Sequence, residues 1–136
     1  MPANLEQNLE LARLCQDILA LNDRIYFVST INKNGKSTES KFRNDRIFRN
    51  LTPQQIEMFY IQRTLQYSLT QEFDDVLGPL DSIIIQRETL LEFIFPFSNG
   101  VVIVMTDLDV ISRYLAKTIS FLIRDFEHRI TNQLFA

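Results

Sequence analysis

The sequence has few of the residues on which many functional sites depend: it contains one cysteine, three glycines, one histidine and no tryptophan. With Cys15 alone, neither an internal disulfide nor a zinc site built from several cysteines is possible. Three glycines are too few for a glycine-rich phosphate loop. His128 has no neighbours in the sequence that suit acid–base catalysis, and the acidic residues of 72–81 lack the spacing of a calcium loop. We therefore expect no enzyme, no cofactor and no metal.

Long apolar runs are also lacking. The longest are far below the ~18 residues of a membrane-spanning helix, and the N-terminus lacks the basic and apolar regions of a secretion signal. We therefore expect no membrane insertion and a cytoplasmic location. The length of 136 residues, of which 46% are hydrophobic and 23% charged, fits one domain that spans 1–136.

Helical periodicity and capping residues predict three helices. The first covers 3–21. The second begins at a capping box, Thr52 to Gln55, and extends to about Val76, before Gly78. The third opens with another capping-box pattern at 106–109 and extends toward the C-terminus.

The apolar faces of these helices indicate how they pack. In the first helix, Cys15 falls in the apolar face, where we expect it to be a small buried hydrophobe. The second helix carries two stripes, one with aromatic residues and an arginine, the other wholly apolar. We predict that the wholly apolar stripe packs on the core and that the other is partly covered. The first stripe is Ile56, Phe59, Tyr60, Arg63 and Tyr67, and the second is Met58, Ile61, Leu65, Leu69, Phe73 and Val76.

Five segments have the composition of β-strands. Residues 24–31 are apolar on both faces, as a central strand requires. An Asn-Gly turn then leads to the polar, lysine-bearing segment 36–42, which suits the edge of a sheet. Three further β-rich runs lie between 80 and 106, with Ser98-Asn99-Gly100 as the turn between the last two.

The resulting order is α-β-β-α-β-β-β-α, which predicts an α+β fold with a five-stranded antiparallel sheet in the order 2-1-5-4-3. The first and fifth strands are the most apolar, so we place them at the centre. The first and last helices are expected to cover one face of the sheet and the middle helix the other.

This order of elements, together with the Asn-Gly hairpin, resembles the roadblock/longin group of profilin-like domains. A closer resemblance, to a family of small uncharacterised archaeal proteins, is carried by Phe27 to Gly35, Glu72 to Pro79, Gln86-Arg87-Glu88 and Phe95-Pro96-Phe97. The resemblance implies an archaeal cytoplasmic protein and implies no activity.

Basic residues are concentrated in residues 33–49. This segment holds six basic and two acidic residues, a charge of +4, and the rest of the chain carries −7. Phe42 and Phe48 lie among the charges, so the segment has the residues to hold phosphates and stack bases. The alternative is a solvated edge strand and loop, and the pI of 5.1 argues against a nucleic-acid partner as the main role. The candidate anion-binding residues are Lys41, Arg43, Arg46 and Arg49.

The third strand is the unusual one, because in the predicted order it forms an edge but carries no charge to protect it. An exposed apolar edge favours pairing with another chain, and two-fold homodimers are the commonest oligomers. The dimer would join two sheets across this strand or pack two middle helices together. The alternative is that the N-terminal segment or the last helix covers the edge. The candidate interface residues are Ser82, Ile83, Ile84 and Ile85 in the strand, and Tyr60, Arg63 and Tyr67 in the helix.

These features favour a non-enzymatic regulatory or scaffolding module that acts as a homodimer and binds a partner protein. Two alternatives stay open. One is a PAS-like sensor that holds a small molecule between sheet and helix, suggested by eleven phenylalanines and the Tyr60/Tyr67 stripe. The other is weak binding of an anion or nucleic acid through the basic segment.

Overall fold

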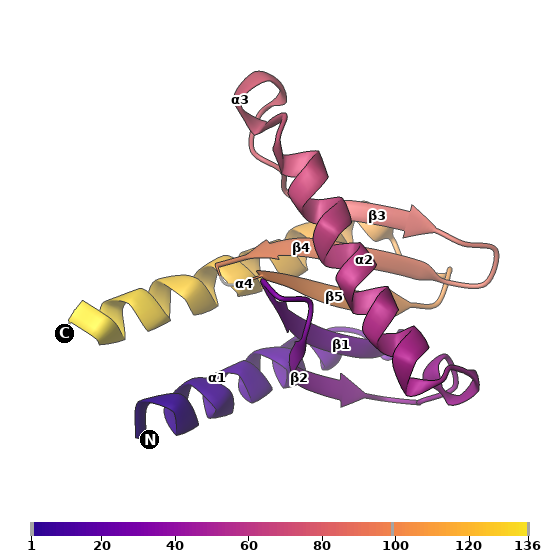
Figure 1. Ribbon diagram of the computed structural model, residues 1–136, viewed down its shortest axis with the longest axis horizontal. Helices are drawn as coiled ribbons and strands as arrows, with labels where there is room; N and C mark the ends of the chain where they lie inside the picture. The colour runs from indigo at the N-terminus through magenta and orange to yellow at the C-terminus, as the bar shows by residue number, and fades with distance from the viewer. Residues whose placement is uncertain (1, 99, 136) are drawn as a thin grey trace.

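The computed structural model describes residues 2–98 and 100–135 and contains five strands, four α-helices and one short 3-10 helix among them (Figure 1). Their bounds in chain order are α1 Pro2–Leu19, β1 Ile25–Asn32, β2 Ser37–Phe42, η1 Phe48–Asn50, α2 Pro53–Gln71, α3 Asp74–Leu77, β3 Ile83–Gln86, β4 Leu91–Phe97, β5 Gly100–Thr106 and α4 Ser112–Phe135.

The five strands form one antiparallel sheet in the order β2-β1-β5-β4-β3, as the sequence predicts. Strand β5 is buried along its whole length and β1 along nearly all of it. A strand covered on both faces has to be apolar on both, which explains the Val-Val-Ile-Val-Met run of β5. The outer strands β2 and β3 are more exposed.

Helices α1 and α4 pack on one face of the sheet and α2 crosses the other (Figure 1). The core on the α1/α4 side includes Cys15, whose thiol is fully buried. Burial raises the pKa of this thiol to about 12, so Cys15 stays protonated and acts as a packing residue, as predicted. No helix among the described residues combines the length and hydropathy that crossing a bilayer requires.

Helix α2 faces the sheet with the opposite side from the one predicted. Tyr60 and Arg63 are buried against the sheet. The reason is a buried carboxylate on the sheet, Glu92, which binds Arg63, and an aromatic cluster that receives Tyr60. The wholly apolar side therefore faces solvent, and its residues within α2 are between 41% and 56% exposed. We call these residues the outer stripe: Met58, Ile61, Leu65 and Leu69.

Two predicted helix ends are also wrong. Helix α2 ends at Gln71, and a separate short helix, α3, follows it. Helix α4 begins at Ser112, not at the capping-box pattern of 106–109. Asp107 accepts a hydrogen bond from the N–H of Asp109 at 3.0 Å and from the hydroxyl of Tyr26 at 3.0 Å. These bonds hold the segment in a turn that joins β5 to α4.

Gly100 opens β5, while Asn99, the middle residue of the predicted turn, lies outside the described residues. The φ of Gly100 is +151°, and a Cβ at this position would lie 1.8 Å from the carbonyl oxygen of Ile31 on the neighbouring strand. No side chain fits there without moving one of the two central strands.

We therefore expect Gly100→Ala to lower the free energy of unfolding by about 3 kcal/mol, through overpacking. Gly78→Ala is the control, because Gly78 also has a positive φ, +95°, but nothing lies within 4 Å of its added Cβ. It should lose only about 1 kcal/mol, from backbone strain. Urea unfolding of both variants measures the difference, and equal losses would contradict the close approach at Gly100.

Candidate functional site

Strand β3 forms an edge of the sheet and has the sequence Ile-Ile-Ile-Gln. One side of the strand pairs with β4, from Ile83 opposite Ile94 to Gln86 opposite Leu91. Helix α1 packs against β1 and β2, near the edge of the sheet opposite β3. Helix α4 lies behind the sheet (Figure 1). Ile84 is 42% exposed, and no charge or proline within β3 discourages pairing with another strand.

The outer stripe of α2 is a second exposed apolar surface. Ile61, Leu65 and Leu69 repeat at the four-residue spacing that places side chains on one helix face, and Met58 completes the row. Continuous exposed apolar rows of this kind are typical of surfaces that contact another protein. The sequence shows the helical spacing of these apolar residues, but it does not show that their side chains face solvent.

Two of the predicted helix residues of the interface lie inside the protomer. Arg63 Nε donates to Glu92 Oε2 at 2.8 Å, and the guanidinium lies 4.7 Å from the centre of the Phe59 ring. Glu92 is 2% exposed and also accepts a hydrogen bond from Arg87 Nε at 2.7 Å. Tyr60 is buried beside them. Contact between two copies of α2 would therefore fall on the outer stripe.

Arg43, a candidate anion-binding residue, is occupied by the chain itself. Its Nε donates to the carbonyl of Ile25 at 2.9 Å, and its Nη2 donates to the carbonyl of Leu19, the last residue of α1. Carbonyls at the end of a helix lack partners within the helix, so Arg43 caps α1. Lys41 belongs to β2 and lies on the sheet face that α1 covers.

The other candidate anion-binding residues lie in the loop before α2. Arg49 pairs with Asp45 at 2.7 Å, and Arg46 is exposed. Phe48 is buried in the aromatic cluster, 4.7 Å from Phe27 between ring centres, so its faces are not available to stack on bases. Lys41 and Arg43 are thus directed toward α1, whereas Arg46 and Arg49 lie in the loop before α2.

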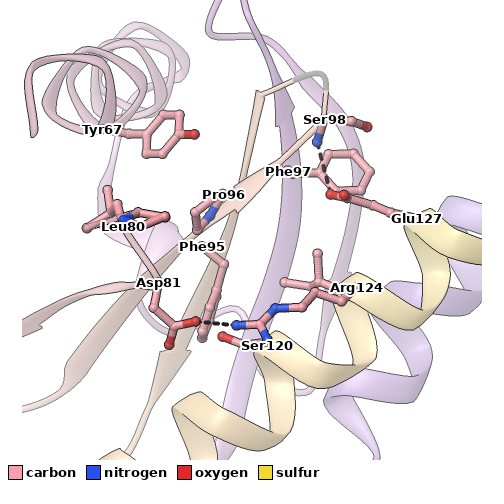
Figure 2. Close-up of a pocket in the computed structure, with 12 residues that line it drawn as sticks. Tyr67, Leu80, Asp81, Phe95, Pro96, Phe97, Ser98, Ser120, Arg124 and Glu127 are labelled. Atoms are coloured by element: carbon pink, nitrogen blue, oxygen red, sulfur yellow. Dashed lines mark hydrogen bonds and ion pairs between the residues drawn. The ribbon is translucent and has the colours of Figure 1, made fainter. Parts of the chain in front are cut away.

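A pocket of about 500 Å³ lies between α4, the end of β4 and the segment that leads into β3 (Figure 2). Tyr67, the third predicted helix residue, is half-buried and lines it. Within 2–98 and 100–135, no three His, Cys, Asp or Glu side chains are placed to hold an ion, those of 72–81 included.

The fold has solved counterparts. A Roadblock/LC7 domain from Streptomyces avermitilis matches with a TM-score of 0.68 and 12% identity, over 89% of this chain and 98% of its own. Myxococcus xanthus MglB matches with a TM-score of 0.70 and 13% identity, over 95% of this chain and 92% of its own. A structure described as MglB with tetrameric arrangement matches with a TM-score of 0.57 and 11% identity, over 89% and 90%.

These similarities show that the chain has the Roadblock/LC7 fold, in agreement with the resemblance in element order. No family model matches the sequence, and no curated protein matches it.

Proposed function

We propose that this chain is a non-enzymatic regulatory or scaffolding module that acts as a homodimer and binds a partner protein. The observation that carries the proposal is the pair of uncovered apolar surfaces, the β3 edge and the outer stripe of α2. In water, both surfaces gain from burial against a second copy.

A two-fold arrangement can use either surface. Pairing β3 with the β3 of a second copy would extend the antiparallel sheet across the axis. Helix α2 crosses the sheet obliquely, and its later turns lie near β3 and β4 (Figure 1). The same axis would therefore place the two α2 helices side by side on one face of the joined sheet. The outer stripes point away from the sheet, so a contact through them would form about a different two-fold axis. The predicted residues Ser82, Ile83, Ile84 and Ile85 stay part of this proposed interface.

The layer of α1 and α4, on the sheet face away from α2, supports the partner-binding part of the proposal. Helix α4 and the residue before it expose three large side chains, Ile111, Tyr114 and Phe121. They lie on the α1/α4 side of the sheet, away from α2. A dimer formed through β3 or α2 would leave them available to another protein.

The solved structures with this fold lend further support, since one of them is described as MglB with tetrameric arrangement. Self-association is thus known for a protein with this fold, at 11% identity to this chain.

Sedimentation velocity over a range of concentrations tests the dimer. We expect a dimer at micromolar concentration that persists when the salt concentration is raised, because apolar contacts are not screened. A monomer at micromolar concentration would overturn the proposal, and dissociation by salt would show that charges, not the two apolar surfaces, hold the copies together.

A further inference from the structure

The pocket of about 500 Å³ has the size of a small-molecule site and is built by three separate parts of the chain. Helix α4 supplies one wall, the end of β4 another, and Tyr67 with the segment before β3 the third (Figure 2). Two of its polar side chains, Ser120 and Glu127, lack the partners that their chemistry requires.

Ser120 is buried, 7% exposed, and its hydroxyl has no hydrogen-bond partner among the described residues. Hydroxyls on helices usually bond the carbonyl four residues earlier. Four threonines of this chain do so: Thr64, Thr70, Thr118 and Thr131. Ser120 does not, although it lies in the same kind of position. A buried polar group without a partner calls for a partner outside the chain.

Glu127 is half-buried, and no lysine or arginine of the described residues pairs with it. Its carboxylate accepts one hydrogen bond, from the N–H of Ser98 at 3.1 Å (Figure 2). Burial raises the pKa of Glu127, which means that its charge is poorly compensated. Arg124, one turn away, is already bound to Asp81 at 2.6 Å.

The charges of the pocket therefore leave one negative group uncompensated. Arg124 and Asp81 neutralise each other, and Glu127 remains. A water molecule would satisfy Ser120 but would leave the charge of Glu127 as it is. A ligand with a protonated amine would neutralise it in a charge-assisted hydrogen bond.

We propose that this pocket binds a small organic ammonium compound, with the amine on Glu127 and a second hydrogen-bonding group at its far end on Ser120. The two residues are seven positions apart on α4, so they lie on one side of the helix, ~10 Å apart along its axis. The body of the ligand is apolar or aromatic, since Tyr67, Pro96 and Phe97 are among the residues that line the pocket. An aromatic wall also favours a cation.

Tyramine is the probe for this proposal, because it carries an ammonium group and a phenol hydroxyl at opposite ends of an aromatic body. Two analogues remove one end each: tyrosol replaces the ammonium group by a hydroxyl, and phenethylamine lacks the phenol hydroxyl. Titration of the full chain, followed by the amide NMR signals of Ser98, Ser120 and Glu127, gives the dissociation constants. We expect tyramine to bind about tenfold more tightly than tyrosol and about fivefold more tightly than phenethylamine.

Two variants assign these preferences to residues. Glu127→Gln keeps an oxygen for the N–H of Ser98 and removes the charge, so it should bind tyramine and tyrosol equally. Ser120→Ala is compatible with a helix. It should keep the preference for tyramine over tyrosol and lose the preference over phenethylamine.

Several results would overturn the proposal. They are signal changes that do not map to the pocket, equal binding of tyramine and tyrosol by the unaltered protein, and a tyramine preference that survives in Glu127→Gln. A preference over phenethylamine that survives in Ser120→Ala would remove Ser120 from the site and with it the second contact that the proposal requires.

Discussion

Arg63→Met is expected to lower the free energy of unfolding by about 3 kcal/mol, because it leaves Glu92 buried without the arginine that α2 supplies. Methionine fills a similar volume, so the loss reports on the charge more than on packing. Glu92 keeps Arg87, which is half exposed and is therefore a weaker partner than a buried arginine. Urea unfolding at one fixed protein concentration measures the change, since self-association would add to stability.

The double variant Arg63→Met/Glu92→Leu separates the ion pair from the fold. Once both charges are gone, the apolar pair should recover most of the stability that the single variant loses, because buried ion pairs often contribute no more than well-packed apolar residues. Arg49→Met is the matched control, since its ion pair with Asp45 is exposed and should be worth less than about 0.5 kcal/mol. A loss in Arg63→Met no larger than the loss in Arg49→Met would contradict the buried pair.

Leu65→Glu is expected to raise the dissociation constant of the proposed dimer by about a hundredfold or more. Leu65 lies in the middle of the outer stripe, and a two-fold interface meets each substitution twice. Burying two unpaired carboxylates costs more than the contact gains. Because Leu65 is 56% exposed in the protomer, the fold of the single chain should be little affected. Sedimentation velocity follows the shift from dimer to monomer.

Phe121→Glu is the control for this experiment. Phe121 is a large apolar residue, 69% exposed, on the opposite layer of the molecule, so the same change of charge there should leave the dimer intact. Ile84→Lys tests the contribution of the β3 edge in the same way as Leu65→Glu tests that of the helix. If Phe121→Glu dissociates the dimer and Leu65→Glu does not, the interface lies on α4.

The sheet order could be predicted from the sequence because burial on both faces leaves a local signature. The apolar run of β5 and the apolar faces of β1 place these strands at the centre, and short connections fix their neighbours. The orientation of α2 could not be predicted in the same way. Both stripes satisfy helical periodicity, and the choice between them depends on Glu92, which lies 29 residues beyond Arg63 in the chain.

The same limit applies to the candidate sites. Arg43 and Lys41 appear together with Arg46 in the sequence, but Arg43, which follows the end of β2, donates to the carbonyls of Ile25 and Leu19. No sequence motif indicates the pocket, because Ser98 and Glu127 come together only when the β4–β5 hairpin packs on α4. The edge strand was recognisable, since its apolar composition conflicts with its place in the sheet.

The ion pairs of Glu92 also affect how α2 and the β3–β4 hairpin are held relative to each other. Glu92 is held at once by an arginine from α2 and by Arg87 from the turn between β3 and β4. The two ion pairs of Glu92 thus link α2 to the β3–β4 hairpin and restrict their relative movement. The protein would thus meet a second copy with both surfaces already in fixed relative positions, and little conformational freedom would be lost on association.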